Sequence, residues 1–218
     1  MPYRKFPPDV GNFYHIFNRS VGKQTIFTCH NDYKRALDTV NFYNFANTPL
    51  RFSYFKRLPN KDKENFLNKL KQSNEIQVDI LAFCFMPNHF HFALREIRKG
   101  GTATFMRKFQ NSYARYFNTK YKRSGALFQS MFKTERVLDE KNLIYVVQYI
   151  HLNPIDSGII KTINDLESYE WGSLIDYIEK RELSFLNKSY ITNKLKTVEE
   201  FKKHTYTDNR ISYHTPGV

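Results

Sequence analysis

The most informative segment of the chain reads Phe85-Met86-Pro87-Asn88-His89-Phe90-His91-Phe92-Ala93-Leu94. In a β-strand successive side chains point to opposite faces, so His89 and His91 share one face while Phe90 and Phe92 point into a core on the other. An apolar run at residues 76–85 comes before this segment, and Met86-Pro87-Asn88 supplies a turn or a bulge between the two. These residues predict two strands that pair as an antiparallel hairpin, with both imidazoles on one side of a sheet.

The segments on either side of this hairpin alternate between strand and helix patterns. Residues 12–18 alternate with the period of a strand, residues 31–45 read as a helix capped by Asn31 or Asp32, and residues 56–72 read as a charged helix inserted on the surface. After the hairpin, Thr102 can cap a helix at residues 103–121, and residues 132–137 form another strand. Asp139 then caps a helix from residue 140 to about residue 152, which Pro154 is expected to end.

This order of elements indicates the fold class and the division of the chain. The order strand, helix, strand, strand, helix, strand, helix fits an α+β fold of the ferredoxin-like (RRM-like) type, an antiparallel sheet with helices on one face. A chain of 218 residues is long enough to bury a sizeable core. We expect residues 8–154 to form the main domain and residues 155–218 to form a C-terminal extension that is partly helical.

The charge balance of the chain points to a polyanionic partner. Lysine and arginine exceed aspartate and glutamate by 34 to 21, which gives a formal net charge of +13. Such an excess favours nucleic acid, because neutralising phosphates releases condensed counterions, although a merely soluble basic surface has the same composition. Cys29 and Cys84 have neither disulfide-scaffold nor zinc-ribbon spacing. With no apolar run after Met1-Pro2-Tyr3-Arg4-Lys5 and no stretch able to span a bilayer, we expect a soluble, cytoplasmic protein without a membrane partner.

The paired histidines are the first candidates for chemistry. Two neutral imidazoles side by side form half of a metal site, and a divalent ion there could assist chemistry on a phosphate backbone. A metal site usually needs a third ligand and outer partners that orient the first ones. Without them, His89 and His91 would be ordinary strand residues satisfied by backbone groups or water, so the pair alone leaves both interpretations open.

The helix expected at residues 103–121 combines cations with aromatic rings. Phe105, Phe109, Tyr113 and Tyr116 recur at helical spacing, so most of this stripe is expected in the core. The cations along and just after the helix, with one more on the next strand, are candidates for contacts with DNA phosphates. These predicted DNA-binding residues are Arg107, Lys108, Arg115, Lys120, Lys122, Arg123 and Lys133. A charged helix face that only meets solvent is the alternative for each of them.

The last of these helices carries two tyrosines. Tyr145, Tyr149 and Asn153 stand four residues apart, so they lie along one stripe of the helix. A tyrosine phenol can attack a phosphodiester, displacing a 3′-hydroxyl and leaving a 5′-phosphotyrosine that conserves the bond for rejoining. A divalent ion held by His89 and His91 would polarise the phosphate, and the Asn153 amide oxygen could complete its coordination. Tyrosines that only pack on the sheet would show the same spacing.

Four short motifs, in the same order along the chain, resemble those of the single-tyrosine HUH transposases. They are Met86-Pro87-Asn88-His89-Phe90-His91, Gly125-x-Leu127-Phe128-Gln129, Tyr149-Ile150-His151-Leu152-Asn153-Pro154 with Gly158 following, and Tyr169-x-Trp171-x-Ser173. The resemblance covers residues 12–177 and is to the REP-associated tyrosine transposase branch in particular. It implies that His89 and His91 bind a divalent metal, Mg²⁺ or Mn²⁺, and that Tyr149 is the nucleophile. Asn153 carries over less directly, because the third ligand varies among relatives and the amide could cap the helix end, and Tyr145 is the reserve nucleophile.

The resemblance also implies a substrate and partners. Members of this family act on single-stranded DNA, often folded as hairpins, so we expect a metal-dependent DNA nickase or transposase that works at the nucleoid. A basic groove suits single strands, since base stacking tolerates many sequences while cations follow the phosphates. Whether one chain or a homodimer assembles the site stays open. The inserted helix and the tail depart from a minimal catalytic core, and tail residues such as Lys194, Lys196, Lys202, Lys203 and His204 could contact DNA or only solubilise the extension.

Two other functions are compatible with the sequence. A non-catalytic, domesticated relative would use the sheet to bind single-stranded nucleic acid, as RNA-recognition folds do, although the coexistence of both histidines with Tyr149 and Asn153 argues against decay. A hydrolytic nuclease or zinc hydrolase would need an acidic partner, and Asp139 and Glu140 lie at the far end of the tyrosine helix. The sequence therefore favours covalent catalysis through Tyr149.

Overall fold

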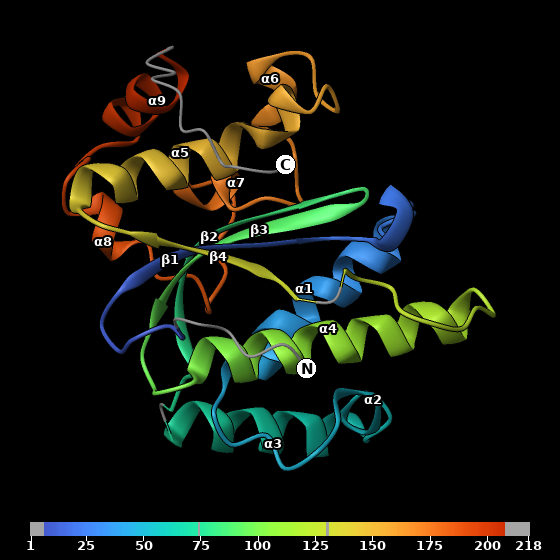
Figure 1. Cartoon of the computed structure of the whole chain (residues 1–218). Helices are drawn as coiled ribbons and strands as arrows, with labels where there is room; N and C mark the ends of the chain where they lie inside the picture. The colour runs from blue at the N-terminus through green and yellow to red at the C-terminus, as the bar shows by residue number, and fades with distance from the viewer. Residues whose placement is uncertain (1–6, 74, 130, 208–218) are drawn as a thin grey trace.

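The centre of the molecule is a four-stranded antiparallel sheet (Figure 1). The computed structural model describes residues 7–73, 75–129 and 131–207, so the lead-in at residues 1–5 and the end of the predicted extension at 208–218 lie outside the described residues. The strands are β1 (Phe13–Arg19), β2 (Val78–Met86), β3 (His89–Glu96) and β4 (Lys133–Val137), and they lie in the order β2-β3-β1-β4. With α1 (His30–Asn44) and α4 (Gly101–Lys120) as connections, this is the ferredoxin-like α+β fold that the element order predicts.

Further helices follow α1 and β4. They are α2 (Phe52–Phe55), α3 (Asn60–Ser73), α5 (Glu140–Asp156), α6 (Ile163–Leu166), α7 (Leu174–Tyr177), α8 (Ser189–Thr192) and α9 (Val198–Tyr206), with a 3-10 turn at Val21–Lys23. The charged helix expected from residue 56 is α3, which begins at Asn60 because Pro59 disfavours helical backbone in the residue before it. Helix α1 begins at His30 rather than after Asn31 or Asp32, so Asp32 lies in its first turn instead of at its cap.

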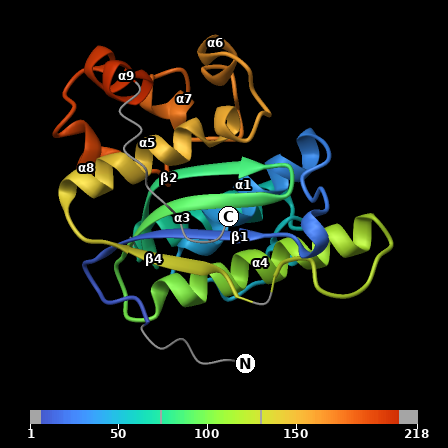
Figure 2. The same cartoon turned by 45° about the horizontal axis from the view of Figure 1, so that its top comes forward.

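The face of the sheet that carries Phe90 and Phe92 forms the larger core. Both rings are fully buried, and α1 and α4 cover this face (Figures 1 and 2). Helix α4 contributes Phe105, Phe109 and Tyr113, which are fully buried at the helical spacing that the sequence predicts. Burying one such aromatic side chain stabilises a fold by about 1.5–3 kcal/mol. The predicted alternation of the histidine strand is therefore confirmed, and its phenylalanines and histidines lie on opposite faces.

Helix α5 crosses the other face of the sheet, the one that carries the histidines (Figure 1). Its apolar residues Leu143, Val147 and Ile150 are buried in a second core with side chains of β2 and β3. Asp139 caps its first turn, as predicted, by accepting a hydrogen bond from the backbone N–H of Asn142. The tyrosine helix therefore lies directly over the strand that holds the paired histidines.

The prediction that Pro154 ends this helix is wrong. Pro154 lies inside α5, which continues to Asp156. A proline near a helix end removes only one hydrogen bond, and its carbonyl accepts hydrogen bonds from the backbone N–H groups of Ile159 and Ile160. The chain leaves the helix at Gly158, whose φ of 68° is the left-handed conformation typical of the residue that follows a helix cap.

The residues after α5 pack against the outer edge of β2. Backbone hydrogen bonds join Trp171 and Ser173 to β2 near one end of the strand and Asn187 near the other. Helices α7 and α9 add Tyr177 and Phe201 to the second core. The division of the chain after residue 154 stays a prediction. Across residues 7–207, apart from the two undescribed positions, no helix has both the length and the apolar character to cross a membrane.

Candidate active site

Strand β1 adds a third histidine to the face that carries His89 and His91. Its antiparallel register against β3 sets Phe17 opposite His91, so His15 lies on the same face two residues earlier. The Nε2 atom of His15 lies 2.9 Å from the Nδ1 atom of His91. On the other side of β1, strand β4 sets Glu135 opposite His15, with the carboxylate Oε2 3.3 Å from the His15 Nδ1. The sheet therefore aligns Glu135, His15 and His91 in one row.

This row of hydrogen bonds fixes which nitrogen of His91 carries a proton. A carboxylate only accepts hydrogen bonds, so Glu135 accepts from the Nδ1–H of His15. In the neutral form of His15, Nε2 then accepts and His91 donates from Nδ1. The Nε2 atom of His91 keeps its lone pair, and it is buried without a hydrogen-bond partner among the described residues.

His89 presents the same nitrogen through a different contact. Its Nδ1–H donates to the Asn88 Oδ1 at 2.5 Å, which leaves Nε2 unprotonated. Burial, with the nearby Arg19 guanidinium, lowers the pKa of His89 to about 4. Burial also holds the pKa of His91 well below its ordinary value, and His15, His89 and Arg19 act in the same direction. Both imidazoles of the pair are therefore neutral near pH 7, which is the form that binds metals.

Helix α5 brings Tyr149 over this histidine row within the same chain. Its ring centroid lies 5.8 Å from that of His91 and 5.7 Å from that of His15, with interplanar angles of 82° and 80°. The Tyr149 side chain is half-buried and packs against the second core. His89, His91 and Tyr149, which the sequence singles out for chemistry, therefore meet on one face of the sheet, and Tyr145 lies one helical turn earlier.

Asn153 lies one turn further along α5, at the end of the sheet where His89 lies. It is buried, and the Ser157 hydroxyl donates to its Oδ1 at 3.4 Å. The same hydroxyl lies 3.7 Å from the sulfur of Met86, which pairs with His89 across the hairpin. Because α5 continues beyond Asn153 to Asp156, the alternative that this amide caps the helix end is wrong.

These side chains fit a divalent ion with an incomplete protein shell. Two neutral imidazoles offer Nε2 lone pairs, and the one on His91 is buried with no hydrogen-bond partner in the described part of the chain. In the same ranges, no group of three or more His, Cys, Asp or Glu side chains has the arrangement of a metal site. His89 and His91 could therefore hold a divalent ion, which would polarise a bound phosphate, and the role of Asn153 as a further ligand stays a prediction.

A small pocket of about 60 Å³ opens beside the two imidazoles. Besides His89 and His91, the pocket is lined by one aromatic ring, two amides and two cations: Phe17, Asn18, Gln129, Arg19 and Lys133. The Lys133 ammonium lies 5.5 Å from the centroid of the Phe17 ring. Lys133 is therefore a predicted DNA-binding cation that the structure sets beside the histidines.

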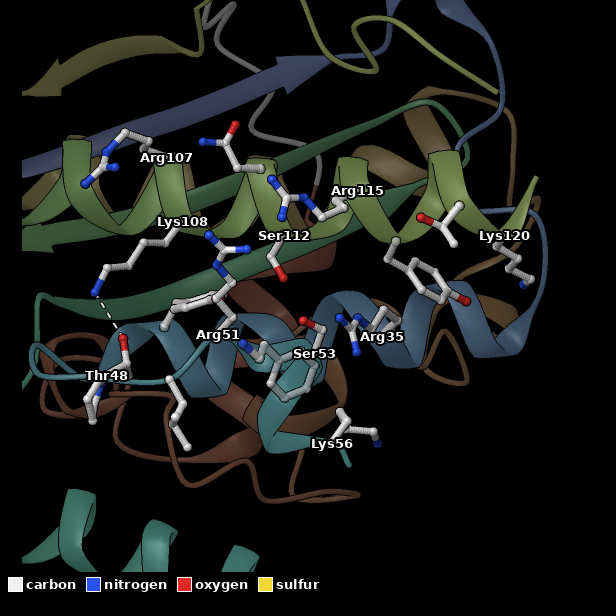
Figure 3. A pocket seen from close by; sticks show the side chains of 17 residues that line it. Arg35, Thr48, Arg51, Ser53, Lys56, Arg107, Lys108, Ser112, Arg115 and Lys120 are labelled. Atoms are coloured by element: carbon white, nitrogen blue, oxygen red, sulfur yellow. Dashed lines mark hydrogen bonds between the residues drawn. The ribbon is translucent and has the colours of Figure 1, made fainter. Parts of the chain in front are cut away.

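Four other predicted DNA-binding cations lie on the opposite side of the sheet. Arg107, Lys108, Arg115 and Lys120 line a larger groove between α4, α1 and the segment around α2 (Figure 3). Lys120 is already paired, since its ammonium lies 2.6 Å from the Asp32 carboxylate. The structure therefore separates these four cations from the histidine pocket.

The last two predicted cations lie in the turn that follows α4. The Arg123 guanidinium donates to the Asn118 side chain at 2.8 Å and to the Ala126 carbonyl at 3.3 Å, so it holds this turn together. Lys122 is exposed and adopts the left-handed conformation, with a φ of 50°. Both residues lie between the groove and the histidine pocket along the chain.

Sequence reasoning missed Glu135 and the second wall of the groove. Alternation would set His15 and Glu135 on the histidine face, but the two are 120 residues apart and their pairing is not visible in either segment. The additional groove cations, Arg35, Arg51 and Lys56, come from helix α1 and the segment around α2. No local pattern marks them, because they join the groove only through tertiary packing.

Comparison with known proteins agrees with the fold. A family model described as "Transposase IS200 like" matches residues 48–153, the stretch that contains the histidine hairpin and most of α5. The fold is similar to the solved structure of a REP-associated tyrosine transposase bound to a REP hairpin, with a TM-score of 0.53, 13% sequence identity, and coverage of 86% of this chain and 97% of that chain. No curated protein matches the sequence. Residues 48–153 therefore match the family of IS200-like transposases, and the fold over most of the chain is similar to that of the REP-associated enzyme.

Proposed function

We propose that the protein cleaves and rejoins single-stranded, hairpin-bearing DNA through a 5′-phosphotyrosine on Tyr149, in DNA transposition or in the processing of REP-type elements. The observation that carries this proposal is the contact of the Tyr149 ring with the His91 ring, 5.8 Å between centroids within one chain. Both residues lie in the stretch that matches the family model. A nucleophile beside two neutral imidazoles is an arrangement suited to metal-assisted, covalent cleavage of a phosphodiester.

The proposed cleavage exchanges one phosphoester bond for another. The Tyr149 oxygen attacks the scissile phosphorus as the phenol loses its proton, and the bond from phosphorus to the 3′-oxygen breaks. The 3′-oxygen takes up a proton and leaves as a hydroxyl, while the 5′-phosphate stays on the tyrosine. Strand transfer reverses these steps with the 3′-hydroxyl of another strand as the attacking group. Because the bond is conserved on the enzyme, no nucleotide cofactor is needed.

The proposed cofactor is a divalent ion, Mg²⁺ or Mn²⁺, held by His89, His91 and the Asn153 amide oxygen. When bound, such an ion polarises the scissile phosphate and offsets charge in the transition state. The protein's own task is to keep both Nε2 lone pairs directed at the site. Glu135 and His15 do this for His91 through the hydrogen bonds of 3.3 Å and 2.9 Å described above.

The proposed substrate is a single strand that carries a hairpin, met at the nucleoid in the cytoplasm. The net charge of +13 favours a polyanion, and the similar solved protein is bound to a REP hairpin, which supports a hairpin substrate here. One chain already contains the nucleophile and both imidazoles. Cleavage is therefore proposed to need no second copy, and a homodimer stays a prediction.

A covalent protein–DNA adduct is the direct test. Labelled hairpin-bearing single strands are incubated with the full chain and Mn²⁺, and the adduct is resolved by denaturing electrophoresis. We expect an adduct with the wild type and its loss, by about 10³-fold or more, in Tyr149→Phe, because the nucleophilic oxygen is removed. Tyr145→Phe is the matched control, since it removes a phenol one turn away on the same helix and should keep the adduct.

The histidine variants test the metal separately. His89→Ala and His91→Ala should abolish the adduct while DNA binding persists, because each removes one ligand nitrogen and no phosphate contact. An adduct that survives Tyr149→Phe would contradict the assignment of the nucleophile. Free ends without attached protein would indicate a hydrolytic nuclease, and tight, metal-independent binding with no adduct on any strand would indicate a non-catalytic binding protein.

A further inference from the structure

Arg19, the last residue of β1, lies on the same face of the sheet as the paired histidines. The register of β1 against β3 sets Arg19 directly opposite His89, and directly opposed residues of an antiparallel pair share a face. Phe17 is opposed to His91 in the same way, and the two rings stack at a centroid distance of 5.4 Å. Arg19 therefore completes the β1 side of the histidine site, at the end where His89 lies.

The Arg19 side chain is part of the lining of the pocket of about 60 Å³ beside the two imidazoles. A pocket of this volume holds a few water molecules, so it admits a phosphate group but not a nucleobase. Arg19 and Lys133 supply cations to the lining, and no aspartate or glutamate is among its described residues. The pocket therefore has the size and the charge to receive one anionic phosphoryl group.

The guanidinium of Arg19 has no anionic partner within the described ranges of the chain. No hydrogen bond or ion pair engages it there, although the side chain is half-buried. Glu135, a carboxylate on this face, accepts a hydrogen bond from His15 instead. Removing a guanidinium from water without a counter-charge costs free energy. The position of Arg19 therefore suits an anion that enters from outside the protein.

The charge of Arg19 acts on both imidazoles of the pair. Burial is the largest cause of the low pKa of His89 and of His91, and the guanidinium of Arg19 lowers both pKa values further. A cation that opposes a proton on these rings also opposes a divalent ion bound to them. An anion that bridges the guanidinium and the histidine site removes this repulsion, because each positive group then faces negative charge.

A guanidinium in this pocket interacts more strongly with the transition state of phosphodiester cleavage than with the substrate. Its planar fork donates two parallel N–H hydrogen bonds to two oxygens of one phosphate. The scissile diester carries one negative charge, and the attacking phenolate oxygen brings a second one. Hydrogen bonds from a fixed cation strengthen as this charge accumulates, and such a difference raises the rate rather than the affinity.

We propose that Arg19 is a catalytic residue that binds the non-bridging oxygens of the scissile phosphate and stabilises the transition state of its attack by Tyr149. The phosphate lies between Arg19 and the imidazoles of His89 and His91, on the face over which α5 carries Tyr149. Arg19 keeps its protons and forms no covalent bond in either step. The inference rests on the proposed function for the reaction, and it adds a residue outside the stretch 48–153 that matches the family model.

Single-turnover cleavage separates catalysis from binding. The full chain, in excess over a labelled hairpin-bearing strand, is mixed with Mn²⁺, and the adduct is followed over time. Arg19→Gln should lower the rate at saturating protein by about 10²-fold or more. Its affinity for the strand, measured by fluorescence anisotropy with a chelator present, should change by less than about 3-fold. Arg19→Lys keeps the charge without the planar fork, so it should recover part of the rate.

A change in the substrate tests the contact itself. Once the cleaved phosphate is mapped, a strand is made in which a methyl group replaces one of its non-bridging oxygens, which removes its charge and one acceptor. Arg19→Gln should slow cleavage of this neutral strand by less than about 3-fold, since the guanidinium no longer has its charged partner. Equal slowing of both strands by Arg19→Gln would contradict a contact with the scissile phosphate.

Arg136→Gln is the matched control, because it removes the same charge from the neighbouring strand β4. Arg136 is exposed and lies opposite Tyr14 of the larger core, so it is on the other face of the sheet. Its cleavage rate and its Mn²⁺ affinity should both stay within about 2-fold of the wild type. A loss of rate equal to that of Arg19→Gln would mean that net charge, rather than the place of Arg19, sets the rate.

Mn²⁺ binding keeps this inference separate from the proposed function, because it needs neither DNA nor cleavage. In isothermal titration of the DNA-free chain, Arg19→Gln should bind Mn²⁺ about 3- to 10-fold more tightly than the wild type, since the repulsion from the guanidinium is removed. A residue that only supports the fold would weaken Mn²⁺ binding and cleavage together. A gain in Mn²⁺ affinity with a loss of rate therefore distinguishes the proposed role from a structural one.

The outcomes of these measurements are distinct. Absence of any adduct with the wild type would contradict the role of Tyr149 and leave the Mn²⁺ result intact. A wild-type rate in Arg19→Gln, or weaker Mn²⁺ binding in that variant, would overturn the assignment of Arg19 alone. If circular dichroism shows that Arg19→Gln is unfolded, Arg19→Lys takes its place in the kinetic assay, and it should still slow cleavage by about 10-fold because the bidentate fork is lost.

Discussion

His15 is the residue on which the protonation of His91 depends. Its ring lies between the Glu135 carboxylate and the His91 Nδ1, and it stacks with the His91 ring at a centroid distance of 5.1 Å. Without this neighbour, either nitrogen of a neutral imidazole can carry the proton. Groups that orient a metal-binding histidine in this way typically change metal affinity by about 10- to 100-fold when they are replaced.

His15→Phe should therefore weaken Mn²⁺ binding by about 10- to 100-fold while keeping an aromatic ring in the sheet. Isothermal titration measures the affinity, and ¹⁵N NMR of the His91 imidazole reports which nitrogen is protonated in the metal-free protein. His30→Phe is the matched control, because His30 is exposed and contacts Trp171 rather than the histidine row. An unchanged affinity together with an unchanged His91 tautomer in His15→Phe would refute this role.

Only part of the histidine site could be predicted from the sequence. His89 and His91 share a face because alternation along one strand is a local property of the sequence. Their orienting partners could not be predicted, because Glu135 and His15 meet only through the pairing of β1 with β4. Asn88, by contrast, is adjacent to His89 in sequence, and the hydrogen bond between their side chains depends on the geometry of the hairpin turn.

Among the helices, α1 and α4 are joined by one buried carboxylate. Asp32, in the first turn of α1, accepts hydrogen bonds from the Lys120 ammonium at 2.6 Å and from the hydroxyls of Tyr116 at 2.9 Å and Tyr121 at 2.7 Å. It also accepts from the Thr28 hydroxyl at 2.6 Å. Burial alone would raise the pKa of Asp32, but these hydrogen bonds outweigh it and hold the pKa well below its ordinary value. The carboxylate therefore links the start of α1 to the end of α4 through hydrogen bonds.

Asp32→Asn should lower the free energy of unfolding by about 3 kcal/mol, because it leaves the Lys120 ammonium and several hydroxyls without their charged acceptor. Urea denaturation measures this change. Asp38→Asn is the control, since Asp38 is on the same helix but 37% exposed, and its pair with Lys56 should contribute less than about 1 kcal/mol. Similar losses in the free energy of unfolding of the two variants would mean that the hydrogen bonds of Asp32 contribute no more than an exposed ion pair.

The elements themselves were largely predictable, and their corrections have local causes. Strand alternation and helical spacing are properties of short segments, so the four strands and the helices α1, α4 and α5 follow from them. The boundaries at Pro59 and Pro154 needed hydrogen bonds that the sequence does not display. The side of the sheet on which α5 lies, and the groove between α4 and α2, arise from contacts between distant segments, which no local pattern contains.

Over the whole molecule, stability should depend on pH through histidines that are buried in the neutral form. Burial lowers the pKa of His151 to about 3 and that of His89 to about 4, and it holds that of His91 well below the ordinary value. Below about pH 6.5 the unfolded chain takes up protons on these side chains while the folded chain does not. The folded state is therefore fully stable above this pH and loses stability as the pH falls toward 4.

The expected loss in the free energy of unfolding is about 1.4 kcal/mol per pH unit for each buried histidine between pH 6 and pH 4. Urea denaturation at several pH values, with a chelator present, measures the slope. His151→Gln should reduce that slope by about 1.4 kcal/mol per pH unit, because one proton-binding group is removed from the unfolded state. A stability that is flat from pH 7 to pH 5, or a slope that His151→Gln leaves unchanged, would count against burial as the cause.

The order in which the sheet is completed has a consequence for a chain that is still being synthesised. Glu135 pairs with His15 across 120 residues, and contacts that close long loops form late because their entropic cost must be met first. A nascent chain released before β4 carries all three histidines of the row but lacks the carboxylate that orients them. Tyr149 is made later still. Translation therefore produces Tyr149, the proposed nucleophile, only after the four strands have been made, so chains released before α5 lack it.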